Sequence, residues 1–486
     1  MAHSLIIFWH RRDLRVTDNA GLTAAREASP KIVGVFCLDP NILQRDDIAP
    51  ARMAYMIGSL QELEQSYAEL GSRLLIIRED PAKGIPGLAA ALGAKAVYWN
   101  LDVEPYSNKR DRTVSQALKE KGIKVKNFWD QLLHPPGAVS TGNGRPYTVY
   151  TPFWKNWSRK VKSEPLPSIP KCEMVMNLDW AIDTSPIPVV PLPSAKELGF
   201  VWEKPLILEP GEKAAFAQLD AFCNVGVFEY NDLRNFPGLN GTSRLSPALK
   251  FGTVGIRNVW NRSTIAWEES RSDESRLGVR TWQQELAWRD FYQSVMYYFP
   301  ELADGPYREA WKNFPWDNNP EHFQAWCEGR TGFPLVDAAM RQLNETAWMH
   351  NRCRMIVASV LTKDLIIDWR WGEKYFMQKL IDGDLSANNG GWQWSASSGM
   401  DPKPIRMFNP ATQARKFDRD AEYICEWLPE LSGVNPEYLI TGKIPVEERD
   451  RCGYPDPIVD RGKNQRLFKE LYKRQKEEIV EQKEIG

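Results

Sequence analysis

The stretch Leu5-Ile6-Ile7-Phe8-Trp9 is a short, wholly apolar run that leads directly into the polar turn His10-Arg11-Arg12-Asp13-Leu14-Arg15. Such a run is typical of a strand buried on both faces of a sheet. Similar buried strands are predicted at 31–38, 73–77, 96–100 and 124–129, with helices at 19–28, 50–70, 86–92 and 107–121. Strands and helices alternating at a spacing of about 30 residues predict an α/β domain with a doubly wound parallel sheet.

The turn after the first strand contains no glycine, so the glycine-rich phosphate fingerprint of dinucleotide enzymes is missing. Ligands of such sheets nevertheless bind at the carboxyl ends of the strands. The sequence therefore predicts a ligand-binding α/β domain that is not of the ordinary NAD type.

The rest of the chain differs in texture. Residues 135–210 hold 13 of the 34 prolines, which predicts a long connector lying over a surface. Apolar spacing of 3.6 residues then predicts helices at 212–222, 255–267, 279–298, 334–346, 351–364 and 371–380. We therefore expect an α/β domain (1–132), a proline-rich linker (133–208) and an all-α domain (209–486).

Composition excludes several classes of protein. The 486 residues include 62 basic and 63 acidic side chains, and 43% are hydrophobic, which excludes a disordered chain. No apolar run approaches the 20 or so residues of a membrane span, and the N-terminus does not resemble a signal peptide. Seven cysteines without a C-x-x-C pair indicate free thiols in a reducing compartment, and only five histidines argue against a metal site. The chain has 20 tryptophans, 13 of them between Trp260 and Trp427, and this local excess calls for a structural or functional explanation.

The motif Gly241-Thr242-Ser243-Arg244-Leu245-Ser246-Pro247 predicts a helix start with Ser246 as the N-cap and Pro247 at the first helical position. Hydroxyl groups at 242, 243 and 246 would then surround free backbone N–H groups, which is an anion site suited to a pyrophosphate. An ordinary capped helix is the alternative.

A second motif places Trp282, Glu285, Trp288, Arg289 and Tyr292 on one helix face. A carboxyl between indoles is partly desolvated, which tends to raise its pKa and allows it to donate a hydrogen bond to a ligand. The alternative is a Glu–Arg surface pair beside core aromatics.

In a third motif, Asn351 and Met355 are four residues apart and share a helix face, which suits a polar heterocycle. A core methionine and a capping asparagine are the bland alternative.

The segment 382–402 is predicted to be a polar loop in which acids, amides and glycines precede Trp392 and Trp394. Its acids could pair with arginine and with a ribityl-type hydroxyl chain, and an asparagine could tune a flavin ring. The segment 402–417 that follows carries Lys403, Arg406, Arg415 and Lys416 without an acid, and could face phosphates or simply be a solvated loop.

Together these motifs resemble the photolyase/cryptochrome family over nearly the whole chain, from residues 9–15 to Gly453-Tyr454-Pro455. Within the family the sequence is similar to the class I cyclobutane pyrimidine dimer photolyases with a deazaflavin antenna. The resemblance implies a carbon–carbon lyase in which light-excited reduced FAD gives an electron to a dimer flipped out of DNA and so splits it. It needs no nucleophile and no metal. A blue-light receptor without repair activity and a flavoprotein electron carrier are the alternatives.

The resemblance also assigns residues. Asn388 would face flavin N5, and Arg354 would pair with Asp382 beside it. FAD contacts are implied for Tyr230, Thr242, Ser243, Leu245, Ser246, Trp282, Glu285, Arg289, Asn351, Arg354, Asp382, Asp384, Asn388 and Asn389. Contacts with DNA or the dimer are implied for Arg234, Glu285, Trp288, Asn351, Arg352, Met355, Trp394, Gln413 and Lys416. Electrons would reach the flavin through Trp392, Trp369 and Trp316, and the residues implied in catalysis are these three with Glu285, Asn351 and Met355.

The antenna residues of the deazaflavin branch match Cys37, Leu38, Asp39, Arg52, Asp102 and Lys250. We therefore expect an 8-hydroxy-5-deazaflavin antenna, with methenyltetrahydrofolate or an empty site as alternatives. The (6-4) repair branch has histidines in place of Asn351 and Met355, which disfavours that substrate, and the C-terminal extension of plant and animal cryptochromes is missing. The resemblance predicts a cytoplasmic monomer with access to the nucleoid, acting on UV-damaged DNA, with no membrane contact and no obligate protein partner.

Overall fold

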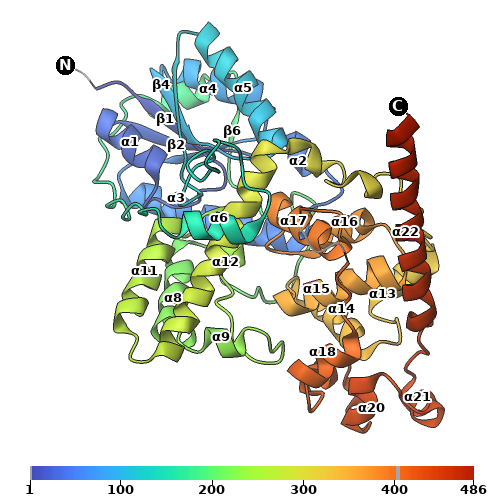
Figure 1. Ribbon diagram of the computed structural model, residues 1–486. Helices are drawn as coiled ribbons and strands as arrows, with labels where there is room; N and C mark the ends of the chain where they lie inside the picture. Colours follow the sequence, from blue (N-terminus) through green and yellow to red (C-terminus); the bar gives the residue numbers. More distant parts are fainter. Residues whose placement is uncertain (1–2, 401–404, 486) are drawn as a thin grey trace. The chain divides into compact units, whose positions relative to one another are not determined.

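The computed structural model describes residues 3–400 and 405–485 (Figure 1). The chain forms two compact units. Unit 1 comprises Met1–Glu229 and Ser243–Pro300, and unit 2 comprises Tyr230–Thr242 and Glu301–Gly486. The domain boundaries proposed after residues 132 and 208 stay a prediction.

A six-stranded sheet in the order β5-β4-β1-β2-β3-β6 forms the centre of the α/β part of unit 1. The strands are β1 (Ile6–His10), β2 (Ile32–Cys37), β3 (Leu74–Ile77), β4 (Ala96–Asn100), β5 (Lys124–Phe128) and β6 (Val189–Val190). Strands β1 to β5 are parallel, and the strand order reverses between β1 and β4, which is where such folds open a ligand crevice. The predicted doubly wound sheet is confirmed.

Helices cover both faces of this sheet. On one face Phe8, Gly34 and Tyr98 are aligned, and a Cβ added to Gly34 would lie 2.5 Å from the Tyr67 ring of α3 (Pro50–Glu69). Helix α1 (Ala20–Ala28) packs on the same face. On the other face, Trp9 and its neighbours share a buried cluster with α4 (Pro81–Ala91) and α5 (Pro105–Glu120).

Three local expectations were wrong. The connector was predicted only to cross the surface, but its segment β6 pairs antiparallel with β3 and extends the sheet. Strand β5 was predicted to be buried, but its side chains are exposed or half-buried because it is the edge strand, where lysines discourage pairing with other chains. A helix was predicted from residue 86, but helix α4 begins at Pro81, because Asp80 caps it and proline suits the first turn.

The helical part of unit 1 carries one very long helix, α12 (Asp273–Tyr298). It begins six residues before the predicted start, because Ser272 accepts a hydrogen bond from the Ser275 N–H as its N-cap. The other helices of unit 1 are α2 (Pro40–Leu43), α6 (Tyr150–Trp157), α7 (Leu178–Asp183), α8 (Glu212–Ala221) with the π-helical turn η1 (Phe222–Gly226), α10 (Ser246–Phe251) and α11 (Ile256–Glu269).

Unit 2 is helical in its described residues. Its α-helices are α9 (Tyr230–Leu233), α13 (Pro320–Glu328), α14 (Pro334–Thr346), α15 (Asn351–Ser359), α16 (Trp369–Lys379), α17 (Leu385–Ala396), α18 (Pro410–Phe417), α19 (Glu422–Trp427), α20 (Pro436–Thr441), α21 (Val446–Cys452) and α22 (Arg461–Ile485). One large hydrophobic core joins α13 to α20. The helix predicted at 351–364 is α15 continued by the π-helical turn η4 (Val360–Asp364). All seven cysteines of the chain are free thiols. The predicted α/β plus all-α architecture is confirmed.

Candidate functional site

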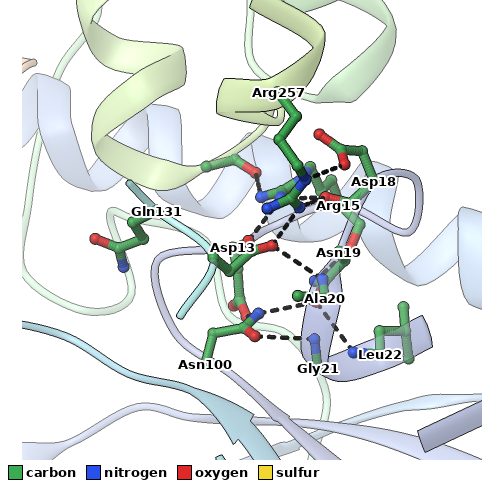
Figure 2. A network of polar contacts seen from close by, with 12 residues as sticks. Asp13, Arg15, Asp18, Asn19, Ala20, Gly21, Leu22, Asn100, Gln131 and Arg257 are labelled. Atoms are coloured by element: carbon green, nitrogen blue, oxygen red, sulfur yellow. Dashed lines mark hydrogen bonds and ion pairs between the residues drawn. The ribbon is translucent and has the colours of Figure 1, made fainter. Parts of the chain in front are cut away.

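The turn after β1 is held by a buried network of charged side chains (Figure 2). Asn100 of β4 donates to Asp13 (Nδ2–Oδ2, 2.6 Å), and Arg15 pairs with Asp130 (Nη2–Oδ2, 2.5 Å). Arg257 of α11 pairs with Asp130 as well (Nη2–Oδ1, 2.6 Å). Burial opposes ionisation of Asp130, but the two guanidinium groups outweigh it and lower its pKa. This turn therefore joins the sheet to α11, which explains why it needs arginine and aspartate rather than glycine.

A second polar group lies at the carboxyl ends of β1 and β4, where the strand order reverses. Arg12 pairs with Asp102 (Nη1–Oδ1, 3.4 Å) and with Glu104 (Nη1–Oε1, 2.7 Å). Lys250 lies 3.6 Å from the same Glu104 oxygen. Burial raises the pKa of Asp102, but Arg12, Arg11 and Lys250 outweigh it, so the net shift is downward and the carboxylate is ionised. Two residues expected at the antenna site, Asp102 and Lys250, are thus brought together.

The other expected antenna residues lie at the end of β2 and on α3. Asp39 caps α2 and accepts a hydrogen bond from Tyr106 (Oη–Oδ2, 2.5 Å). Arg52 donates to the Asp47 carbonyl (Nη2–O, 2.7 Å). Cys37, followed in the chain by the buried Leu38, donates its S–H to the Glu79 carbonyl, and burial raises its pKa to about 12.

Sequence reasoning missed Arg12, Glu104 and Tyr106 at this site. Their position just after strand ends was the available signal. The pairing of residues up to 238 positions apart, as between Arg12 and the Lys250 carbonyl, was not readable from the sequence.

The expected pyrophosphate motif is corrected in one respect. Helix α10 begins at Ser246 itself, its N-cap is Leu245, and no side chain caps it. The prediction of Ser246 as the N-cap was therefore wrong. The Ser243 carbonyl accepts a hydrogen bond from Gln218 (Nε2–O, 2.9 Å). Ser243, Leu245 and Ser246 belong to unit 1, whereas Tyr230 and Thr242 belong to unit 2.

Helix α12 of unit 1 carries four of the expected flavin and dimer residues, Trp282, Glu285, Trp288 and Arg289. Trp282 is buried against Phe222 (ring centroids 5.0 Å apart), and Glu285 is half-buried one turn later. Arg289 donates to the Gln131 carbonyl (Nη1–O, 2.5 Å). It also donates to the Leu249 carbonyl (Nη2–O, 3.4 Å) and lies near Asp290, so Arg289 joins α12 to the segments around residues 131 and 249.

Helix α15 of unit 2 gathers four of the expected residues within five positions. Its N-cap is His350, whose Nδ1 accepts the Arg352 N–H (3.1 Å), so the alternative of Asn351 as the cap was wrong. Asn351 is exposed and Met355 is half-buried one turn away. Arg354 pairs with Asp382 (Nη2–Oδ2, 2.8 Å), which is the ion pair that the resemblance implies.

Two of the expected DNA-binding cations lie over one phenylalanine of unit 2, and a third lies near one of them. The Arg352 guanidinium lies 4.6 Å and the Lys416 ammonium 5.2 Å from the centre of the Phe417 ring. Burial and then the positive charge of Arg234 lower the pKa of Arg352. We name Arg234, Arg352, Lys416 and Phe417 the Phe417 cluster. It concentrates positive charge on a chain whose net charge is −1.

The segment after Asp382 was predicted as a loop, but most of it is helix α17. Asp384 accepts the Ala387 N–H (Oδ1–N, 2.9 Å) as its N-cap, which allows the glycines to be helical. Asn388 donates to the Glu373 carbonyl (3.0 Å), and Asn389 donates to the Leu302 carbonyl (2.8 Å) and to Glu373 Oε1 (3.0 Å). These bonds hold α17 beside α16.

The three tryptophans of the expected electron path pack in or against the core of unit 2. Trp392 and Trp369 are buried in it, and Trp316 is half-buried against its side. A Cβ added to Gly372 of α16 would lie 2.1 Å from the Trp392 ring, so this glycine allows the two helices to approach closely. Trp394 is half-buried under the Arg406 guanidinium (4.9 Å from the ring centre).

The basic segment is partly helical. Residues Pro410–Phe417 form α18, which carries Gln413 and Lys416, whereas Lys403 lies outside the described residues. Arg415 pairs with Glu437 (Nη2–Oε1, 2.6 Å). A hollow of about 530 Å³ is lined by Ala411, Thr412, Arg415, Lys416, Thr441 and Lys443. Across the described part of the chain, no helix is long and apolar enough to cross a membrane, and no cluster of three or more potential ligands could hold a metal ion.

Comparison with known proteins identifies the family of the chain. A family model described as DNA photolyase matches residues 6–171, and one described as the FAD binding domain of DNA photolyase matches residues 282–474. A deoxyribodipyrimidine photo-lyase of Synechococcus sp. is 57% identical over 98% of each chain. The crystal structure of a class III photolyase from Agrobacterium tumefaciens is similar with a TM-score of 0.88, 32% identity and 98% coverage of both chains.

A further solved structure, an archaeal photolyase from Sulfolobus tokodaii with two FAD molecules, has a TM-score of 0.81 and 33% identity over 97% of this chain and 100% of the other. All three proteins are named photolyases, which supports DNA repair over the receptor alternative. The chain belongs to the photolyase/cryptochrome family and has its DNA photolyase and FAD-binding domains.

Proposed function

We propose that this chain uses light to split cyclobutane pyrimidine dimers in DNA, as an enzyme of the class I branch. The observation that carries the proposal is the layout of α15. Arg354 pairs with the buried Asp382, Arg352 belongs to the Phe417 cluster, and Asn351 and Met355 lie on the same short helix. Helix α15 thus carries the ion pair expected beside the flavin, part of a cationic surface and two residues expected to bind the dimer.

The residues around Asp382 fit a flavin. Its Oδ1 atom is buried without a hydrogen-bond partner among the described residues, while Oδ2 is held by Arg354. An unpaired buried acceptor next to a guanidinium suits a ligand that presents an N–H donor and carries negative charge. Reduced FAD, when bound, supplies the electron that light excites. The remaining expected FAD residues, including Asn388 and Ser246, would hold its ring and its phosphates.

The dimer would be recognised through hydrogen bonds and apolar contacts, not through positively charged side chains. Glu285 and Asn351 would hydrogen-bond its carbonyl and imide groups, while Met355, Trp288 and Trp394 would cover its apolar surface. Photolyases are among the enzymes known to act on an extruded base. The dimer would therefore leave the duplex before these residues contact it.

The DNA backbone would lie on the basic surface of unit 2. The Phe417 cluster supplies Arg234, Arg352 and Lys416, and Gln413 lies on the same helix as Lys416. Such contacts position the strand without reading its sequence, because every phosphate is alike. This suits an enzyme whose target is a lesion, not a sequence.

Electrons would enter through Trp316, Trp369 and Trp392, which restore the reduced flavin. The support is that all three belong to, or pack against, one hydrophobic core, with Trp316 on its side. Their indoles are also structural residues, since an electron path through a protein is made of packed rings.

We propose that 8-hydroxy-5-deazaflavin is the antenna. Arg12, Asp102 and Lys250 at the end of β1 and β4 provide charged partners for a polar ring system at the place where this fold binds ligands. A folate, a second FAD or an empty site would each give a different absorption spectrum of the purified protein. A strong band beyond that of flavin supports the deazaflavin, and a flavin spectrum alone refutes it.

The substrate is cellular DNA, so we place the enzyme in the cytoplasm with access to the nucleoid, acting as a monomer. Sedimentation of the purified protein tests the monomer, and a stable dimer without DNA would refute it.

The decisive experiment is repair of a thymine-dimer oligonucleotide by the purified, reduced protein, compared in light and in darkness. Light-dependent loss of the dimer is expected, and its absence would refute the repair function in favour of a receptor. Glu285→Ala should lower the repair yield by about tenfold, the value of one hydrogen bond to a charged group, while FAD stays bound. Glu274→Ala, an exposed carboxylate on the same helix, is the control and should repair normally.

A further inference from the structure

The connector between the two predicted domains places a side chain against Trp288, a residue of the proposed dimer site. Tyr150 begins helix α6, within the proline-rich residues that sequence reasoning gave no role. Its ring lies parallel to the Trp288 indole, with ring centroids 3.5 Å apart and an angle of 7° between the planes.

The hydroxyl of Tyr150 holds the same turn of α12. It donates to the Gln284 carbonyl (Oη–O, 2.9 Å). Gln284 precedes Trp288 by four residues, so in the α-helix its carbonyl is also the acceptor for the backbone N–H of Trp288. One tyrosine therefore covers a face of the Trp288 ring and binds the carbonyl that anchors the Trp288 backbone.

The rest of α6 keeps Tyr150 in this place. Phe153, one turn later, packs edge-on against Phe291 of α12 (5.3 Å between centroids), and Trp157 donates to Asp290 (Nε1–Oδ2, 2.9 Å). Both side chains are buried. Tyr150, Phe153 and Trp157 share one helix face at spacings of three and four residues, so this face of α6 packs along α12.

Two tyrosine rings contact Trp288. Tyr150 covers it at 3.5 Å, and Tyr292 of the next turn lies 5.5 Å away at an angle of 29°. A side chain held in this way does not lose rotamer freedom when a ligand binds, which makes binding tighter. The indole is still half-buried, not fully covered, so part of it remains available to a ligand.

We infer that Tyr150 is a positioning residue for recognition of the pyrimidine dimer, acting through Trp288. This inference rests on the proposed function, because only a dimer-binding Trp288 needs such support. Tyr150 itself need not touch the dimer. Its loss should weaken binding of damaged DNA selectively, whereas the backbone contacts of the Phe417 cluster should be unaffected.

The test compares Tyr150→Leu with Tyr150→Phe and measures the Kd for a thymine-dimer oligonucleotide and for its undamaged counterpart. An aromatic pair of this kind corresponds to about a two- to tenfold change in Kd, so Tyr150→Leu should weaken dimer binding by that factor. Binding of undamaged DNA, FAD content and repair yield per bound dimer should not change. Tyr150→Phe keeps the stacked ring and should retain most of the dimer affinity.

Tyr147→Leu is the matched control, because Tyr147 belongs to the same connector but packs on Phe153 instead of Trp288 (6.2 Å between centroids). A double-mutant cycle completes the test: in a Trp288→Leu background, Tyr150→Leu should have no further effect on dimer affinity. Unchanged dimer affinity in Tyr150→Leu, equal losses for both DNAs, or an equal loss in Tyr147→Leu would overturn the inference. If wild-type protein itself shows no preference for the dimer, the proposed function fails instead.

Discussion

The buried carboxyl of Asp290 provides a quantitative test of the packing between α6 and α12. Asp290 accepts hydrogen bonds from Trp157 (Nε1–Oδ2, 2.9 Å) and from the His134 backbone N–H (N–Oδ2, 3.4 Å). Its Oδ1 atom has no hydrogen-bond partner among the described residues, although Arg289 lies 3.8 Å away. Burial outweighs the attraction of Arg289 and raises the pKa of Asp290 from 3.8 to about 6.

The sign of the effect follows from where the proton is held. Because the folded protein keeps this proton to a higher pH than the unfolded chain, the group contributes stability at low pH and loses it as pH rises through 6. With the two pKa values above, the free energy of unfolding falls by about 1.3 kcal/mol between pH 5 and pH 7 through this group alone. Asp290→Asn cannot titrate, so this loss should be missing from the variant.

The measurement is the difference in free energy of unfolding between Asp290→Asn and wild type, from urea titrations followed by tryptophan fluorescence at pH 5 and pH 7. This difference should rise by about 1.3 kcal/mol in favour of the variant toward pH 7. The cost of burying the new amide is the same at both pH values and cancels. His134, whose pKa burial and Lys162 lower to about 4, has the opposite pH dependence but is present in both proteins.

Asp273→Asn is the control, since this carboxylate lies on the same helix with its side chain 97% exposed. It should show no such change with pH. A difference for Asp290→Asn that is the same at pH 5 and pH 7 would mean that Asp290 has an ordinary pKa, and would refute the argument from burial.

Three further predictions concern unit 2. Trp316→Phe should block photoreduction of oxidised flavin but spare repair once the flavin is chemically reduced, and equal loss of both activities would contradict the electron path. The control Trp371→Phe, on an exposed indole of α16, should retain both photoreduction and repair. Lys416→Ala should weaken DNA binding and reduce the slope of log Kd against log salt by about one, as measured by fluorescence anisotropy, and an unchanged slope would show that Lys416 contacts no phosphate. Gly372→Ala would bring a Cβ to within 2.1 Å of the Trp392 ring, so it should destabilise the protein by about 1–3 kcal/mol in urea unfolding and slow photoreduction. A variant as stable as wild type would show that α16 and α17 can move apart without cost.

The architecture was largely predictable, because strands and helices follow from local patterns of apolar residues. All five parallel strands were predicted within about a residue of their observed ends, and the helix at Pro334–Thr346 matches its prediction. One error shows how distant contacts can override a local pattern. Residues 385–396 hold glycines and asparagines that favour a loop by themselves, but a capping aspartate and contacts with Glu373 make them a helix.

For the candidate site, too, some features followed from local sequence and others from the packing of distant segments. Which residue types could serve a flavin, a dimer or a phosphate was determined by the sequence alone, through motifs such as those around Glu285 and Asn351. The partners were not, because a side chain's neighbours depend on how distant elements pack. The stacking of Tyr150 on Trp288, the sharing of Glu104 by Arg12 and Lys250, and the gathering of cations around Phe417 each join segments far apart in the chain. Only the tertiary structure could decide them, since contacts at 3 to 5 Å arise from packing and leave no period in the sequence.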